Sequence, residues 1–196
     1  ELETNYMVND MLDLMFVASF GNWKFDGDAN GNYQETEYND AGQAIGYQTT
    51  EYAYALDGLY VGDMPQTSYI LGVTLRPIKD LSIQAIHKMY DKNYSDWSPS
   101  AREFDGTNDD ADRSQVWEAP SYNRLDLHMS YKLPKVKDLD MVLSAHIFNA
   151  LDEVYVQDAV DNSQYNGFGS KVHAAHNAEV FLGTPRYANI GLSIGF

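Results

Sequence analysis

The chain has 196 residues, no cysteine, and 29 acidic against 13 basic side chains, so its formal net charge is −16. That charge argues against nucleic acid as a partner, because counterion release from phosphates needs a basic surface. Without cysteine, the residues form neither a disulfide scaffold nor a thiolate metal site. No run approaches the ~18 apolar residues of a membrane helix, but a membrane β-barrel leaves no such run.

Alternation of apolar and polar side chains with a period of two predicts about seven strands of about ten residues each. In chain order, the expected strands are residues 2–8, 12–20, 68–76, 81–90, 122–133, 139–149 and 187–196. The phase of the second strand blurs near Gly21, where we expect a β-bulge. In the fourth strand His87 falls on the otherwise apolar side.

The segment 122–133 shows the pattern most clearly. Its apolar set is Leu125, Leu127, Met129, Tyr131 and Leu133. Its polar set is Arg124, Asp126, His128, Ser130 and Lys132. In a strand these two sets point to opposite faces, whereas a helix would scatter both around its circumference. The segment therefore predicts a strand with one apolar face and one charged face.

The connections between these strands alternate strictly between short and long. Residues 8–10, 77–80 and 134–138 form the short ones, and residues 26–66, 91–121 and 151–185 the long ones. Alternation alone is also typical of a soluble antiparallel sandwich, but loops this long are unusual in compact soluble domains. Ten tilted residues rise about 25 Å, the height of an outer-membrane apolar band. The fold class expected is all-β, a membrane-spanning antiparallel β-barrel segment.

The last strand carries a pattern known from barrel proteins. A polar residue, a glycine and two hydrophobic residues follow one another at Asn189, Gly191, Ile194 and Phe196. This matches the end signal by which barrel proteins reach the barrel-assembly machinery, and strand addition to an exposed sheet edge is a mechanism for it. We expect that machinery to be a partner.

Segment 143–155, LSAHIFNALDEVY, resembles the penultimate-strand motif of TonB-dependent outer-membrane receptors, with Ala150 departing from the usual residue. Similar stretches are VGDMPQ (61–66), WEAPSYNRLDL (117–127) and FLGTPRY (181–187). The resemblance implies that residues 1–196 are the C-terminal portion of a 22-stranded barrel, without its N-terminal plug, its TonB box and its earlier strands. It also implies a location in the outer membrane of a Gram-negative bacterium.

By the same resemblance, the protein would be an active transporter that imports a scarce nutrient such as an iron chelate, corrinoid, glycan or peptide. Its partners would be the plug and earlier strands of the same receptor, the TonB complex acting through the plug, and membrane lipid and lipopolysaccharide. Whether a surface lipoprotein lid covers the loops stays open. The expected lumen-facing residues are Arg76, Arg124, Asp126, His128, Lys132 and His146. Packing against the plug, or simple hydration, explains these charges better than direct ligand contact.

Two patterns raise the question of a metal. Asp26, Asp28, Asn30, Asn32 and Glu37, with a glycine at position 31, satisfy the spacing of a Ca²⁺-binding loop. No helices flank the segment, so an Asp- and Gly-rich turn is the favoured interpretation. His173 and His176 have helical-turn spacing but no third ligand, so exposed loop residues are expected there. No other cofactor is expected.

No catalytic constellation is present, so we do not expect an enzyme. The acidic runs at residues 26–32 and 108–112 read as solvated loop faces. Two alternatives to the transporter remain open. One is a complete eight-stranded structural or adhesive outer-membrane barrel, with its eighth strand within residues 44–60. The other is a secreted carbohydrate-binding β-sandwich.

Overall fold

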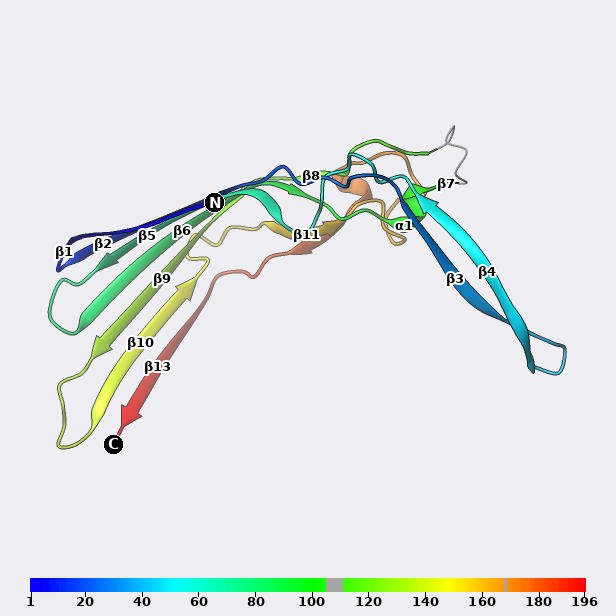
Figure 1. Ribbon diagram of the computed structural model, residues 1–196. Helices are drawn as coiled ribbons and strands as arrows, with labels where there is room; N and C mark the ends of the chain where they lie inside the picture. The colour runs from blue at the N-terminus through cyan, green and yellow to red at the C-terminus, as the bar shows by residue number, and fades with distance from the viewer. Residues whose placement is uncertain (105–110, 168) are drawn as a thin grey trace.

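The computed structural model describes residues 1–104, 111–167 and 169–196 (Figure 1). The main sheet contains β1 (Leu2–Asn9), β2 (Leu12–Phe20), β5 (Pro65–Leu75), β6 (Leu81–Tyr94), β9 (Tyr122–Lys132), β10 (Asp140–Phe148) and β13 (Tyr187–Gly195). These seven strands follow one another in that order and every neighbouring pair is antiparallel. The all-β, antiparallel fold class is therefore confirmed.

The remaining elements lie in the connections. They are β3 (Ala29–Tyr38), β4 (Ala44–Tyr54), α1 (Pro99–Arg102), β7 (Glu103–Phe104), β8 (Glu118–Ala119), β11 (Val156–Val160), the 3₁₀ turn η1 (Ala175–Asn177) and β12 (Glu179–Leu182). Strand β8 extends the main sheet by pairing with the end of β6. Strands β3, β4 and β7 form a second sheet, and β11 and β12 a third.

The register of the main sheet sorts its side chains onto two faces. One cross-strand row runs through Asp13, Thr74, Gln84, His128, His146 and Asn189. The next row, one residue along each strand, runs through Leu14, Val73, Ala85, Leu127, Ile147 and Ala188. Successive residues of a strand point to opposite sides, so the first row belongs to a polar face and the second to an apolar face.

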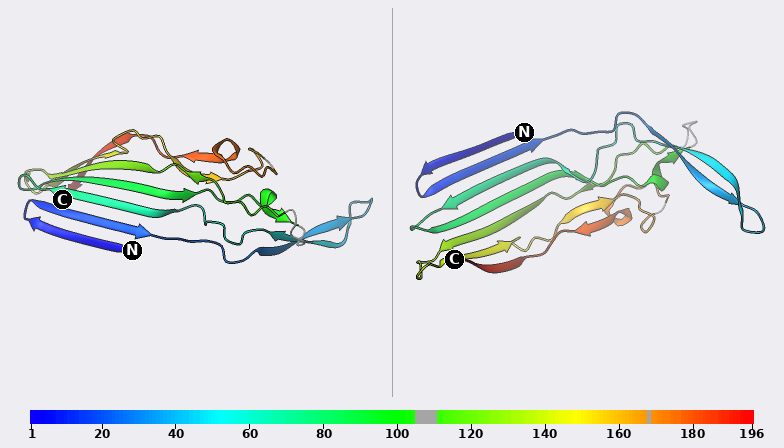
Figure 2. Two further views of the ribbon diagram at one scale, coloured as in Figure 1. Left: turned by 90° about the horizontal axis from the view of Figure 1, so that it is seen from above. Right: turned by 60° about the horizontal axis from the view of Figure 1, so that its bottom comes forward.

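The main sheet is a single curved layer, as the two views of Figure 2 show. Large apolar side chains on its apolar face are exposed, among them Ile190 at 78%, Leu192 at 54% and Leu71 at 51%. The buried apolar cluster of the described residues lies instead in the connections, around Leu56, Leu59 and Val116. A β-sandwich buries one face of each sheet against the other, so the sandwich alternative is wrong for this sheet.

Short and long connections leave opposite ends of the main sheet, as expected (Figures 1 and 2). The region 44–60 does contain a strand, β4, but β4 pairs with β3 and β7 and not with the main sheet. Within the described residues, the outer edges of β1 and β13 pair with nothing. The eight-stranded alternative is therefore wrong, because its eighth strand lies elsewhere and the sheet stays open.

The three long connections pack against one another beyond the sheet. Asp96 of the second connection donates its backbone N–H to Ala159 of the third at 2.7 Å, and its carbonyl accepts from Asp161 at 2.8 Å. Phe25 of the first connection packs against the cluster of Leu56 and Val116. The hairpin β3–β4 projects away from this assembly (Figures 1 and 2). In the ranges described, no helix has the length and apolarity to cross a membrane.

Candidate functional site

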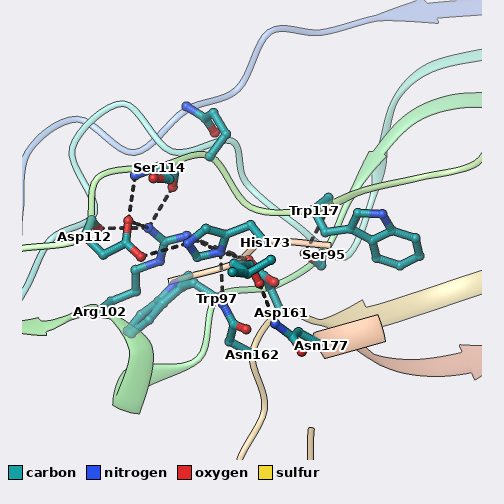
Figure 3. A network of polar contacts seen from close by, with 12 residues as sticks. Ser95, Trp97, Arg102, Asp112, Ser114, Trp117, Asp161, Asn162, His173 and Asn177 are labelled. Carbon is teal, nitrogen blue, oxygen red and sulfur yellow. Dashed lines mark hydrogen bonds and ion pairs between the residues drawn. The ribbon is translucent and has the colours of Figure 1, made fainter. Parts of the chain in front are cut away.

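A buried charge cluster joins the second and third connections, and we call it the loop junction: Arg102, Asp112, Asp161, Asn162 and His173 (Figure 3). The side chain of Arg102, at the end of α1, is 1% exposed. It donates to the carbonyl oxygens of Asp112 at 2.9 Å and Ser114 at 2.7 Å. These bonds hold the backbone at Asp112 and Ser114 against the guanidinium.

His173 lies between the two carboxylates of the loop junction, and its side chain is only 6% exposed. Its Nε2 is 2.9 Å from Oδ2 of Asp112, and its Nδ1 contacts Oδ2 of Asp161. A doubly protonated imidazolium can donate to both carboxylates at once. Arg102 and Asn162 also lie 3.1 Å from Nδ1, so four groups from two connections surround one ring.

The charges of the loop junction balance when His173 is protonated, because two carboxylates then meet one guanidinium and one imidazolium. The hydrogen bond to Asp161, and then that to Asp112, raise the pKa of His173 above its ordinary value, although burial opposes them. Burial alone would raise the pKa of Asp112, but hydrogen bonds from His173 and Ser114 hold it below its usual range. The loop junction is thus a buried ionic clamp.

A second cluster lies on the polar face, near the end of the sheet that carries the long connections. Asp126 is 1% exposed and accepts from Nζ of Lys88 and from the backbone N–H of Asn149, both at 2.9 Å. Arg124 lies 3.6 Å from the same carboxylate and donates to the hydroxyl of Tyr155 at 3.2 Å. This cluster ties the adjacent strands β6 and β9 to the turn after β10.

All six residues expected to face a lumen lie on the polar face. His128 and His146 are cross-strand partners with their Nδ1 atoms 2.9 Å apart. Lys132 lies 3.7 Å from Asp140, and Arg76 forms an ion pair with Asp13. The structure thus places Arg124 with Asp126 and His128 with His146, whereas Arg76 and Lys132 stand apart at the end with the short turns.

The segment that resembles the receptor motif builds the turn after β10. Asn149 has a positive φ of 50°, and its side chain donates to the carbonyls of Glu153 at 2.9 Å and Thr184 at 3.2 Å. Tyr155 is buried and stacks on Tyr122 with ring centroids 4.3 Å apart. The motif residues therefore anchor the start and the end of the third connection to the sheet.

The structure shows where the five residues of the Ca²⁺-loop pattern lie. Asn30, Asn32 and Glu37 lie in the extended strand β3, where they pair with Ala53, Glu51 and Gly46 of β4. Donors spread along a strand at about 3.3 Å per residue cannot surround one ion. Asp28, before the strand, forms a bidentate pair with Arg113 at 2.8 and 2.7 Å, which lowers its pKa. The side chains of Asp28, Asn30, Asn32 and Glu37 therefore do not converge on one point.

Two further expectations concerned His173 and the acidic run 108–112. His173 is buried in the loop junction, contrary to the expectation of an exposed loop residue. Of the acidic run 108–112, residues 108–110 lie outside the described residues, and Asp112 is buried and paired with His173. Within the ranges described, no group of three His, Cys, Asp or Glu side chains could hold a metal ion.

The residues of the expected end signal lie at the open edge of the main sheet. Asn189, Gly191 and Ile194 belong to β13, and Phe196 follows that strand and is fully exposed. Arg102, Asp161 and Asn162 were missed by sequence reasoning, because nothing in the local pattern distinguishes them from solvated loop residues. The HAAH spacing drew attention to His173 for a metal, not for an ion pair.

No protein-family model matches the sequence, and no curated protein matches it. Among solved structures, the chain is similar to the ferric-catecholate import receptor Fiu from E. coli K12 in its closed form, with 16% sequence identity and a TM-score of 0.40. The similarity covers 98% of this chain and 27% of that receptor, so the chain spans about a quarter of the receptor's length.

Proposed function

We propose that this chain is part of the wall and the outer loops of an outer-membrane transporter of the TonB-dependent kind. The observation that carries the proposal is the two-faced single-layer sheet. Its apolar face exposes leucine, isoleucine and valine side chains with no protein layer over them among the described residues. Lipid acyl chains are the solvent that such a face matches.

The polar face supports the same proposal. It carries the Lys88, Arg124 and Asp126 cluster and the His128–His146 pair on adjacent strands. In a barrel that spans the outer membrane, strands alternate between a lipid-facing and a lumen-facing side. The polar face would then line the lumen, where it packs against a plug or meets water.

The open edges of the sheet define what else the transporter needs. In the hydrocarbon layer every backbone N–H and C=O must be paired, so only a closed barrel is stable there. Among the described residues, β1 and β13 each leave one edge unpaired. Further strands of the same receptor would pair with both edges, and its plug would fill the lumen; this chain then contributes the C-terminal portion.

These 196 residues contain no cysteine, so single labels can be placed in them for a direct test on the intact transporter in vesicles, with any cysteine elsewhere in the receptor replaced by serine. Leu127→Cys and Ile147→Cys place a bimane fluorophore on the apolar face, and Ser130→Cys and Ser144→Cys place it on the polar face of the same two strands. Brominated acyl chains should quench the first pair strongly and the second pair weakly. Equal quenching of both pairs would show that the apolar face does not contact lipid.

Import itself needs a separate measurement, because insertion does not establish transport. Energy from the inner membrane would reach the plug through the TonB complex, so uptake of the nutrient should stop when a protonophore collapses the proton-motive force. Uptake that continues unchanged would favour a passive pore. The nutrient remains a scarce solute such as an iron chelate, corrinoid, glycan or peptide.

A further inference from the structure

A hollow of about 440 Å³, whose lining combines apolar surface with polar side chains, lies between the second and third connections, next to the loop junction. We call it the hydroxyl pocket, and its polar lining is Ser98, Ser100, Ser163, Gln164, Tyr165 and Glu179. Pro99 and Val160 supply apolar wall. Its volume falls within the usual range for small-molecule sites, about 300 to 1,000 Å³.

The polar side chains that line the hydroxyl pocket favour one class of ligand. Three serine hydroxyls and an amide both donate and accept hydrogen bonds. Among the described residues, no lysine, arginine or histidine lines the pocket, and Glu179 is the one carboxylate in its lining. An anionic ligand would therefore meet a carboxylate and no compensating cation, whereas a neutral ligand with hydroxyl groups meets no such repulsion.

The lining of the hydroxyl pocket also includes one aromatic ring, that of Tyr165. Tyr165 is 75% exposed, and so it presents its ring at the mouth of the pocket. A flat exposed ring offers a large amphipathic contact area to the C–H face of a sugar ring. The ring is held by a turn in which the Ser163 hydroxyl accepts the backbone N–H groups of Tyr165 and Asn166, both at 3.2 Å.

Buried residues next to the hydroxyl pocket hold its lining in place. Ser163 directly follows Asp161 and Asn162 of the loop junction, and both of these side chains are almost fully buried. On the opposite wall, Ser98 is buried and its hydroxyl lies 3.0 Å from that of Ser100. Val160 pairs with Glu179 across β11 and β12, which fixes the third wall.

We propose that the hydroxyl pocket binds a neutral carbohydrate, with Tyr165 stacking on a sugar ring and the serines and Gln164 hydrogen-bonding its hydroxyl groups. The proposal names a ligand class for the proposed transporter, and it rests on that function only for placing the pocket outside the membrane. Binding is measured in detergent, so its failure and a failure of transport are separate results.

The test uses the intact protein in detergent with maltohexaose, cellohexaose and mannohexaose as neutral probes and a galacturonic acid hexamer as the anionic one. Calorimetry should detect binding of at least one neutral probe, and the protein should bind the anionic probe more weakly. Tyr165→Ala should weaken the neutral probe about tenfold, the loss of one aromatic stack, whereas Tyr165→Phe should retain binding because the ring remains.

Tyr47→Ala is the matched control, because Tyr47 is 70% exposed on the β3–β4 hairpin, outside the pocket. It should bind like the unchanged protein. Binding of none of the neutral probes, preference for the anionic hexamer, or unchanged affinity in a folded Tyr165→Ala protein would each overturn the proposal. Gln164→Ala adds a second check, since the Gln164 side chain is exposed and its loss should weaken binding of the neutral probe without unfolding the protein.

Discussion

A positive charge at Leu127 tests whether the apolar face contacts lipid. Leu127 is the middle residue of β9, five residues from Tyr122 and five from Lys132. Five residues span about 17 Å of strand, which a tilt of about 40° reduces to a height of about 13 Å. Half of an apolar band about 25 Å tall is the same height, so under the proposed function Leu127 would lie near the bilayer midplane.

Arginine at the midplane of a membrane barrel costs about 2–4 kcal/mol. Leu127→Arg should therefore reduce the folding equilibrium constant in vesicles roughly 30- to 900-fold. Ser130→Arg is the control, because Ser130 lies three residues along the same strand and points to the polar face. A lumen-facing charge stays hydrated, so this variant should change stability by under about 1 kcal/mol.

The measurement is a guanidinium titration of the intact barrel folded into phospholipid vesicles, with the folded fraction followed by tryptophan fluorescence. The same titration in detergent micelles should give a smaller difference between the two variants, because arginine reaches water more easily there. If both substitutions shifted the midpoint equally in vesicles, the apolar face would not contact acyl chains and the membrane proposal would fail.

Three further predictions concern the connections. Arg102→Met leaves Asp112 and Asp161 without their guanidinium, so the free energy of local unfolding of residues 96–102 and 156–162, measured by hydrogen exchange, should fall by about 3–5 kcal/mol. Arg186→Met is the control, because it breaks only the exposed pair with Asp152, and it should lower that free energy by under about 1 kcal/mol. Because the folded-state pKa of His173 is raised, its stabilisation is complete below the unfolded value of about 6.5 and is lost as pH rises through the folded value. Over that interval the protection of these amides, relative to the exchange rates of an unfolded chain, should fall. His173→Gln should remove this fall in protection. The same fall in the His173→Gln protein would contradict the idea that a protonated His173 stabilises the loop junction. Gly183→Ala should cost about 1–3 kcal/mol because its Cβ would overlap the Tyr155 ring, whereas Gly31→Ala, which meets no atom within 4 Å, should be nearly neutral in the same thermal melts.

The strands of the main sheet could be predicted because one of their faces is apolar with few exceptions, such as His87. Segment 122–133 was expected as a strand, and β9 spans Tyr122–Lys132. The ends were less accurate: β6 continues to Tyr94 beyond the expected residue 90, because its last residues pair with Pro65 and with β8. Pairing can extend a strand where the alternation of side chains has already ended.

The hairpin β3–β4 shows where the pattern carries no signal. Along most of its length both faces are solvent-exposed, and its exposed residues include Tyr38, Ile45 and Tyr47 as well as acidic and amide side chains. Without one buried face, there is no reason for apolar residues to recur at every second position. The segment 26–66 was therefore interpreted as a long loop, and its aspartates and asparagines as an Asp- and Gly-rich turn with the spacing of a Ca²⁺-binding loop.

The loop junction could not be predicted for a different reason. Its members come from positions 102, 112, 161, 162 and 173, and each is a polar residue in a polar stretch. Only the packing of two connections, held by backbone bonds of Asp96, brings them together. Local sequence carries no information about such a meeting, because charged residues in loops are usually solvated.

The distribution of burial distinguishes the surroundings of the sheet from those of the connections. The sheet exposes Ile190 and Leu71, while the connections bury Arg102 and Asp161 almost completely. A protein placed wholly in water would lose stability from both choices, since exposed apolar area and desolvated charge each cost free energy. Exposed apolar side chains and buried charges are compatible in one protein when the sheet faces hydrocarbon on one side. The apolar side chains of the sheet then need no protein core. The connections would remain in water and would need a core of their own. The Leu56, Leu59 and Val116 cluster is that core, and the loop junction fastens it where apolar residues are few.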